Sequence, residues 1–593
     1  MYAAYTNRWI EIDLTRRRVE TGRPDPSLLD AYIGGKGLGF RLLADRALHT
    51  DPLSPENPII FVTGPLTGTT VPTGARSALV TKSPLFGGAL DSHVGGSIGP
   101  KIKAAGYDTL TVTGRAASPL VLHVTPDGVD FLEAEDLWGR GVFETEKALR
   151  KKFADGRVIS IGPAGENLVR FANVANDLYR HYGRGGAGAV MGSKNLKAIV
   201  VEGDRKIEYS DRDEFVRLNR ELAKDVVAHP NRKRRYELGT MMWVRMGQEI
   251  GRFLPTRNFQ AGEFEGYERI TSETMNRELH WEHTGCWRCI IRCSKFARWD
   301  GKELEGPEYE TTAFLGSGCG IADAKTVAEA NWLCDDLGLD TISCGVTSSF
   351  AMECYEKGLV GDADGLDLRF GNGEALLALI PKIARREGIG DVLAEGTRRA
   401  ALQIAQGSEY FAIHTAGMEL SGVNVKGSLS MGLGLATSDF ASHTRIWTAT
   451  DEMYGNLSIE DLPAHVKHGQ DNVNIRNSLI VCDFMPFGVS RLAPILNAAT
   501  GMNVTDEDLY QIGDRIANLA RMFNSVNGRS AKDDTLPERF FSEPMTAGLL
   551  EGKPLTREFF ADLLQKYYKE RGWDEDGVPT DEKLRQLDLG RLR

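Results

Sequence analysis

The sequence predicts an α+β protein that is rich in β-strands in its first third and mainly helical afterwards. Short segments of branched apolar residues, most of them bounded by Gly, Pro or Asp, fill the first third. Apolar residues at helical spacing fill most of the remaining two thirds. The 593 residues are too many for one hydrophobic core, so we expect two or three domains.

The expected strands start close to the N-terminus. The segment Trp9-Ile-Glu-Ile-Asp-Leu14 alternates apolar and polar residues, and Arg18-Val-Glu-Thr21 follows it after a short turn. The other expected strands are residues 59–63, 77–81, 109–113, 120–124, 158–161 and 198–201.

Capping residues mark the expected helices. Ser210 is expected to cap a helix that runs to Val226, and Asp323 a helix that runs to residue 337. Gly338 suits the left-handed position after that second helix, and Asp340 would cap the next helix. Further helices are expected at residues 492–499, 506–524 and 554–568, and the charged tail from residue 572 is expected to be irregular.

Charge and hydropathy restrict the class of protein. The net charge of -11 argues against nucleic acid as a partner, because phosphate binding needs a basic face. The same charge permits an electron-transfer partner that carries a basic patch. No apolar run approaches the length of a membrane span, and the N-terminus has no export-signal pattern. We therefore expect a cytoplasmic protein without a membrane partner.

The cysteine pattern predicts a metal centre. Cys286, Cys289 and Cys293 form a C-x2-C-x3-C run, and soft thiolate ligands favour zinc or an iron–sulfur cluster. A cubane needs a fourth ligand, for which remote Cys482 is the best candidate. The alternative is a zinc site with four cysteine ligands, but zinc knuckles usually carry two C-x2-C pairs. The other four cysteines are expected to be small buried apolar residues.

Two glycine-rich motifs and one acidic motif have less specific chemistry. Residues 34–39 lack the G-x-G-x-x-G spacing of a dinucleotide site and fit a glycine turn before a helix. Arg184 with the glycines around it suits either an anionic group or a tight strand connection, and composition does not separate these. Asp335 and Asp336 would lie in a last helical turn, where the helix dipole disfavours negative charge and a compensating group is needed.

Two glutamates and a histidine are candidate acid–base groups. Glu308 and Glu310 would point the same way only in an extended segment, and His443 stands in a polar segment. Each alone is more typical of a surface carboxylate or a hydrogen-bonded histidine.

Taken together, these motifs resemble the tungsten-containing aldehyde:ferredoxin oxidoreductases across nearly the whole chain. The resemblance is strongest in ordered motifs that run from the first glycine motif to the acidic motif. These motifs lie at residues 34–39, 72–77, 82–88, 95–100, 104–108, 184–197, 286–293, 306–311 and 335–343.

The resemblance implies a β-rich N-terminal domain that cradles a pterin cofactor, followed by two mainly helical domains. We place these domains at residues 1–208, 209–414 and 415–593. It also implies a tungsten, or molybdenum, bis-pterin centre, one [4Fe–4S] cluster on the four named cysteines, and Mg²⁺ bridging the pterin phosphates. A metal held by dithiolene sulfurs needs no side chain as a ligand, so the protein motifs would grip the pterins. The implied cofactor-binding residues are Arg76, His93, Gly95, Arg184, Gly185, Gly186, Asp335, Asp340 and Asn477.

By the same resemblance, Glu310 and His443 are the catalytic pair, with Glu308 as an alternative to Glu310. They would serve oxidation of an aldehyde to a carboxylic acid, with electrons passing to ferredoxin or to an iron–sulfur electron-transfer subunit. One alternative is reduction of a carboxylic acid or aromatic acyl thioester on the same cofactor. An alternative of another class is a non-catalytic iron–sulfur electron-transfer scaffold.

Three positions depart from the family pattern. Asn477 stands where the second pterin motif has Asp, and His93 replaces an asparagine. Trp332 stands where some members have the histidine of a dimer-bridging iron site, so we expect no such iron. The resemblance implies an oligomer, but that substitution puts the simple homodimer in doubt.

Overall fold

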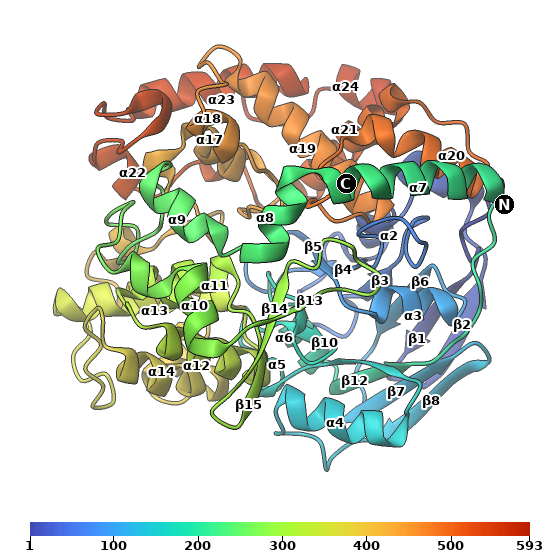
Figure 1. Cartoon of the computed structure of the whole chain (residues 1–593), viewed down its shortest axis with the longest axis horizontal. Helices are drawn as coiled ribbons and strands as arrows, with labels where there is room; N and C mark the ends of the chain where they lie inside the picture. The colour runs from blue at the N-terminus through green and yellow to red at the C-terminus, as the bar shows by residue number, and fades with distance from the viewer. Residues whose placement is uncertain (593) are drawn as a thin grey trace.

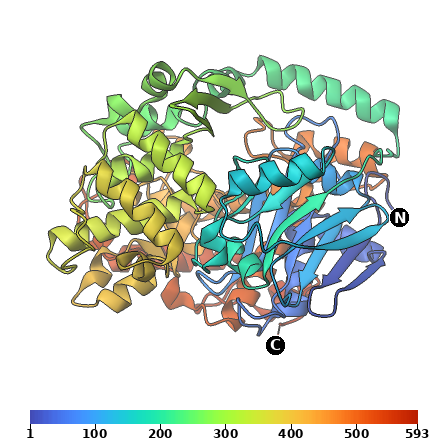
Figure 2. The same ribbon diagram turned by 90° about the horizontal axis from the view of Figure 1, so that it is seen from below.

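The computed structural model describes residues 1–592 as three blocks that meet around a common centre (Figure 1). Two β-sheets and their short helices form the first block, drawn in blue and cyan. Helices from the middle of the chain, green to yellow, lie beside the sheets, and orange and red helices cover a further side. Figure 2 shows the sheets and the middle helices as neighbouring layers. The predicted α+β fold is confirmed.

The first sheet has six strands in the order β2-β1-β6-β3-β4-β5. β1 and β6 pair in parallel, and the other neighbours are antiparallel. Strands β3 and β4 are buried along their whole length, which explains their continuous runs of apolar residues. The strands are β1 (Trp9–Asp13), β2 (Arg18–Gly22), β3 (Ile59–Val62), β4 (Ser77–Lys82), β5 (Ala89–Val94) and β6 (Thr109–Thr113).

The second sheet has six strands in the order β11-β10-β9-β12-β7-β8. Its central strand β12 pairs in parallel with β7 and antiparallel with β9. Its short edge strand β11, which pairs with β10, leads into the glycine loop of residues 183–186. The strands are β7 (Leu120–Thr125), β8 (Gly128–Glu133), β9 (Arg157–Ser160), β10 (Val174–Asn176), β11 (Arg180–Tyr182) and β12 (Leu196–Val201).

The remaining strands form small sheets among the helices. β13 (Glu282–Thr284), β14 (Ser294–Trp299) and β15 (Lys302–Glu305) form an antiparallel sheet whose first connection contains the C-x2-C-x3-C run. β16 (His414–Thr415) and β17 (Met418–Glu419) form a two-stranded ladder.

Helices of the first block and the middle of the chain position most of the site. In the first block they are α1 (Pro26–Tyr32), α2 (Gly35–Ala47), α3 (Ile98–Ala104), α4 (Val142–Lys152), α5 (Pro163–Glu166) and α6 (Ala187–Gly192). In the middle they are α7 (Arg212–Ala228), α8 (Pro230–Leu238), α9 (Met242–Glu249), α10 (Ser272–Leu279), α11 (Tyr309–Leu315), α12 (Ala324–Leu337), α13 (Thr341–Glu356), α14 (Gly373–Arg385), α15 (Ile389–Leu393) and α16 (Thr397–Ile404).

The last third contributes α17 (Leu429–Thr437), α18 (Ala449–Met453), α19 (Leu462–Leu479), α20 (Ala493–Thr500), α21 (Asp506–Val526), α22 (Arg539–Ser542), α23 (Arg557–Arg571) and α24 (Asp581–Gln586). The predicted irregular tail is therefore wrong at α24, which Thr580 caps by accepting a hydrogen bond from the Lys583 N–H. The predicted cap at Ser210 is wrong by one residue: the side chain of Asp211 accepts from the Glu214 N–H and begins α7.

One large hydrophobic core joins the sheets to the helices. A continuous cluster of buried apolar side chains runs from Ile10 in β1 to Trp573 beyond α23. A second cluster joins α2 to α19 and α21. The domain limits at residues 208 and 414 stay predictions. Within residues 1–592, no helix has both the length and the apolar character needed to cross a membrane.

Candidate active site

A cavity of 580 Å³ lies where the three blocks meet. Each block contributes to the cavity wall residues that the sequence predicts to act at the site. The predicted residues that line it are Arg76, Gly95, Cys286, Cys289, Cys293, Glu310, His443 and Cys482. His93, Arg184, Gly185, Gly186, Asp335, Asp340 and Asn477 are not among its lining residues.

The cysteine run forms a tight loop against the first sheet. The Trp287 N–H donates to the Gly96 carbonyl oxygen at 3.0 Å, and the Cys289 N–H donates to that of Cys286 at 3.0 Å. A Cβ atom at position 95 would lie 2.4 Å from the Cys286 sulfur. Gly95 is therefore needed for the close approach of this thiol, which gives it a physical role independent of any cofactor.

All four candidate cysteine ligands lie close enough to interact electrostatically. Cys293 interacts with Cys286 and Cys482, and Cys289 interacts with Cys286. Burial raises the pKa of the Cys289 and Cys293 thiols and raises the pKa of Cys482 to about 12. Thiolates at these positions need a cationic centre to hold them. Within residues 1–592, no three His, Cys, Asp or Glu side chains are close enough to ligate a single metal ion.

Arg76 stands at the cysteine end of the cavity. The largest attractive charge interactions of its guanidinium group are with Cys482, Asp483 and Cys286. One terminal nitrogen lies 3.5 Å from Asp483 Oδ1. Arg76 is thus placed to stabilise negative charge on these cysteine sulfurs.

Glu310 and His443 face each other in the same cavity. His443 Nδ1 lies 3.1 Å from Glu310 Oε1. The angles at these two atoms do not make a hydrogen bond, and neither atom has another partner in the described chain. A buried carboxylate oxygen and a buried ring nitrogen therefore face each other without a hydrogen bond, an arrangement that calls for an explanation.

A two-residue segment anchors this pair. The Gly422 N–H donates to Glu310 Oε2 at 2.8 Å, and the His443 N–H donates to the Ser421 hydroxyl at 2.9 Å. The Tyr309 hydroxyl donates to the Gly422 carbonyl oxygen, which fixes the segment against α11. The sequence gives no indication of this segment, because it is irregular and its partners are distant along the chain.

Glu308 and Glu310 both line the cavity but have different hydrogen-bond partners. Glu308 is the N-cap of α11 and Glu310 lies in its first turn, so the segment is not extended. Glu308 accepts hydrogen bonds from the hydroxyls of Thr240 and Ser294. Its carboxylate already has protein partners, whereas Glu310 Oε1 has none.

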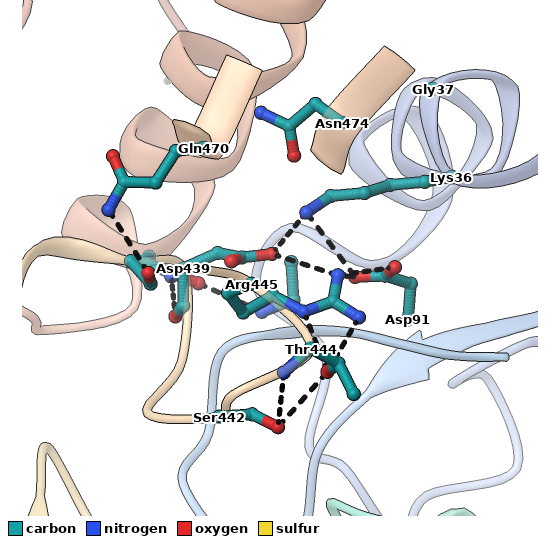
Figure 3. Close-up of polar contacts among 12 residues, drawn as sticks. Lys36, Gly37, Asp91, Asp439, Ser442, Thr444, Arg445, Gln470 and Asn474 are labelled. Carbon is teal, nitrogen blue, oxygen red and sulfur yellow. Dashed lines mark hydrogen bonds and ion pairs between the residues drawn. The ribbon is translucent and has the colours of Figure 1, made fainter. Parts of the chain in front are cut away.

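A buried ion network holds the loop that carries His443 (Figure 3). Arg445 Nη1 donates to both oxygens of Asp91, at 2.8 and 2.6 Å. Lys36 Nζ lies 2.7 Å from Asp439 Oδ2 and 3.6 Å from Asp91 Oδ1. Although burial alone would raise it, the charges of Arg445 and Lys36 hold the pKa of Asp91 well below its ordinary value. The network joins α2, β5 and the loop after α17.

The acidic motif folds as predicted around Gly338. Asp323 begins α12, and Gly338 ends it with a φ of 77°. Asp340 accepts from the N–H groups of Ile342 and Ser343 and caps α13. The charges in the last turn of α12 are compensated within the protein.

Both carboxylates of that turn have named partners. Asp335 accepts from the Asn331 amide at 3.0 Å and lies 3.0 Å from His181 Nε2. Asp336 accepts from the Phe143 N–H at 3.0 Å. Burial raises the pKa of both carboxyl groups.

Arg184 is buried and already bonded to the protein. Its guanidinium group donates to the carbonyl oxygens of Ala441 and Glu419 and lies 3.3 Å from Asp340 Oδ2. Gly185 and Gly186 have left-handed φ values of 88° and 86° and connect β11 to α6. These contacts fit a tight strand connection, and anion binding by Arg184 stays a prediction.

The three residues that depart from the family pattern, His93, Asn477 and Trp332, do not line the cavity. His93 Nε2 lies 2.8 Å from Asp91 Oδ2, and burial lowers the pKa of His93 to about 4. Asn477, near the end of α19, has a buried amide nitrogen without a partner in the described chain. A Cβ atom at Gly35 would lie 2.1 Å from the Asn477 carbonyl oxygen, so α2 packs closely on this turn. Lys302 binds Glu329 at 2.7 Å, and Trp332 packs on Phe143.

Family models match nearly the whole chain. The model described as "Aldehyde ferredoxin oxidoreductase, N-terminal domain" matches residues 9–203, and "Aldehyde ferredoxin oxidoreductase, domains 2 & 3" matches residues 217–589. The tungsten-containing aldehyde ferredoxin oxidoreductase of Pyrococcus furiosus is 39% identical over 608 residues, with 99% of each chain covered. The enzyme of the same name from Thermococcus kodakarensis is 38% identical over 608 residues, again with 99% of each covered.

A solved structure has the same fold. The active-site complex BamBC of benzoyl coenzyme A reductase with 1,5-dienoyl-CoA matches with a TM-score of 0.88 and 25% sequence identity. The match covers 100% of this chain and 98% of the other.

Proposed function

The chain belongs to the aldehyde ferredoxin oxidoreductase family, and from this premise we propose that it oxidises aldehydes to carboxylic acids and passes the electrons to an iron–sulfur protein. The observation that carries the proposal is the Glu310–His443 pair. His443 Nδ1 and Glu310 Oε1 lie 3.1 Å apart, and both residues line the cavity that the four cysteines also line.

The residues present fit the cofactors of such an enzyme. A tungsten bis-pterin group with Mg²⁺ would supply two-electron redox chemistry when bound, and a [4Fe–4S] cluster would supply one-electron transfer. Cys286, Cys289, Cys293 and Cys482 would hold the cluster, since their buried thiols need a cationic centre. The unpartnered Asn477 amide nitrogen suits a heterocycle edge, and Arg76 would lie beside the cluster.

Glu310 is the proposed general base. Its Oε2 is occupied by the Gly422 N–H, so Oε1 is the atom that takes the proton from the attacking water or from the aldehyde carbon. Because the Gly422 N–H fixes the carboxylate, Oε1 keeps one orientation, toward His443.

His443 is the proposed hydrogen-bond donor to the carbonyl oxygen of the substrate. Negative charge develops on that oxygen during attack, and a fixed donor stabilises it without reorganisation. The Ser421 hydroxyl fixes the backbone at His443, and the Arg445–Asp91 pair fixes the loop two residues further on.

The experiment is an anaerobic assay of the purified holoenzyme with a panel of aldehydes and an artificial electron acceptor. We expect stoichiometric carboxylate, with one oxygen atom derived from labelled water. Absence of aldehyde-dependent electron transfer from a protein that contains its metal and cluster would reject the proposal.

The structural match to a benzoyl-CoA reductase complex favours one second candidate, reduction of an aromatic acyl thioester. The same panel separates the two functions. Thioester reduction with a low-potential donor, without aldehyde oxidation, would replace the first function by the second.

A further inference from the structure

Helix α8 lies on the loop that carries three of the four candidate cluster ligands (Figure 1). Arg232 Nε donates to the Ile290 carbonyl oxygen at 3.2 Å. The rings of Tyr236 and His283 stack with centroids 4.1 Å apart, and Lys295 Nζ donates to the Tyr236 carbonyl oxygen at 2.8 Å. The helix and the loop therefore form one surface directly outside the cysteines.

This surface is basic although the chain is acidic. The net charge of the whole chain is -11, but α8 carries four cations against the single carboxylate of Glu237. Residues 285–293 carry two arginines and no acidic residue. We call this surface the basic collar. Its members are Arg232, Lys233, Arg234, Arg235, Arg288 and Arg292.

The charges of the collar are largely uncompensated within residues 1–592. Of its six cations, only Lys233 has a carboxylate within 4 Å in that range, at 3.8 Å from Glu237. Arg288 and Arg235 lie over the rings of Trp287 and Phe484, and Arg292 donates to the His283 carbonyl oxygen.

The exposed cations of the basic collar differ in their surroundings from its partly buried cations. Lys233, Arg234, Arg288 and Arg292 are exposed, and Arg234 has only a long contact to the Met246 sulfur among the described residues. The neighbouring carboxylates are already engaged elsewhere: Glu282 pairs with Arg298, and Asp225 with Arg491. Exposed cations without partners attract an anionic surface.

We propose that the basic collar is the docking surface for an acidic iron–sulfur protein that removes electrons from the cluster. This inference rests on the proposed function for the source of the electrons. Two one-electron transfers through this surface balance the reaction: R-CHO + H2O + 2 oxidised acceptors give R-COO⁻ + 3 H⁺ + 2 reduced acceptors.

The position and the charge of the basic collar both favour an acidic iron–sulfur protein as its partner. Arg232 binds the carbonyl oxygen of Ile290, and residues 285–293 carry three of the four cysteines, so a partner seated on the collar comes close to the cluster ligands. Val227, where α7 meets α8, is 55% exposed and provides an apolar contact beside the charges. Charge complementarity of this kind steers encounter and fixes orientation in transient complexes. The overall negative charge would favour a basic partner, but the local charge at the electron exit has the opposite sign.

The test is the binding of an oxidised, acidic bacterial ferredoxin to the complete holoenzyme, measured by surface plasmon resonance. The variant is Lys233→Glu/Arg234→Glu, because both side chains are exposed and neither supports the cysteine loop. The matched control is Lys357→Glu/Arg385→Glu, which reverses two exposed cations at the ends of α13 and α14. Turnover with an uncharged quinone, iron content and the cluster EPR signal are recorded for each protein.

We expect the collar variant to raise the Kd for ferredoxin about tenfold or more at low ionic strength. Binding by the unmodified protein should weaken steeply from about 20 mM to about 300 mM salt. The control variant should match the unmodified protein, and quinone turnover should be the same in all three.

Equal ferredoxin binding by the collar variant, or an equal loss in the control, would overturn the proposal. So would a collar variant that loses binding to anionic vesicles or to DNA but keeps its affinity for ferredoxin. Failure of the proposed function would appear separately, as absence of aldehyde-dependent quinone reduction in every protein, because ferredoxin binding is measured without turnover.

Discussion

Arg445 and Asp91 form an ion pair in which neither side chain is more than 3% exposed, with the closest nitrogen–oxygen distance at 2.6 Å. Asp91 lies in β5, and Arg445 lies two residues beyond His443. The pair therefore ties the loop of a proposed catalytic residue to the first sheet. Its removal would affect both stability and the position of His443.

Replacement of Arg445 by Met should destabilise the protein by about 3–5 kcal/mol, because Asp91 would remain buried without its main counter-charge. Thermal unfolding followed by circular dichroism measures the loss. The control is Arg298→Met, whose exposed pair with Glu282 should contribute at most about 1 kcal/mol. Equal destabilisation of the two variants would contradict the prediction that the buried Arg445–Asp91 pair contributes more to stability than an exposed pair.

Glu310→Gln should lower kcat roughly a hundredfold or more while metal and iron contents stay unchanged, since the amide cannot accept the proton. Glu308→Gln is the matched control, because the Glu308 carboxylate already accepts hydrogen bonds from Thr240 and Ser294. Steady-state kinetics with one aldehyde measure kcat for both variants. A larger loss of kcat in the Glu308 variant would mean that Glu308, and not Glu310, is the general base.

The double variant Glu310→Gln/His443→Asn should lose little more activity than the more damaged single variant. The two side chains are 3.1 Å apart and act on one substrate group, so their effects should not add. A double-variant loss equal to the product of the single losses would show that they act independently.

Cys482→Ser should reduce the iron content and alter the EPR signal of the cluster, whereas Cys344→Ser should leave both unchanged. Cys344 is fully buried in α13 and does not line the cavity. Iron retention in the Cys482 variant would mean that another residue completes the cluster.

The raised pKa of Glu146 predicts that the stability of the protein depends on pH. Burial raises the pKa of Glu146 to about 8, although Arg150 opposes the shift. A raised folded-state pKa gives stability that is complete below the unfolded value and is lost as the pH rises through the folded value. Glu146→Gln should remove this dependence, so that the loss of on the order of 2 kcal/mol from about pH 5 to about pH 8 disappears. Chemical denaturation at several pH values measures it, and an unchanged slope would contradict the assignment.

Local patterns predicted most of the fold. The alternating and branched segments became β1, β3, β4, β6, β7, β9 and β12, and Asp323 and Gly338 mark the ends of α12 as expected. The short strands β10 and β13 were missed because segments of three residues carry no periodicity. Helix α24 was missed because its residues are mostly charged and one buried leucine, Leu584, fixes it.

Local patterns predicted less of the site. The cysteine run came from its spacing, and the Glu310 and His443 candidates came from the family resemblance. The Arg445–Asp91 pair joins residues 354 positions apart. No local signal marks such a contact. The basic collar was missed for a different reason: net charge averages over the surface, and only the fold brings α8 beside residues 285–293.

The content of tungsten, molybdenum, iron, zinc and pterin in protein purified without oxygen from its native host shows which cofactors the cavity holds. We expect about one tungsten, about four irons and the bis-pterin cofactor per chain. Four irons without tungsten, molybdenum or pterin would leave an electron-transfer scaffold, and one zinc without iron would contradict the assignment of the four cysteines.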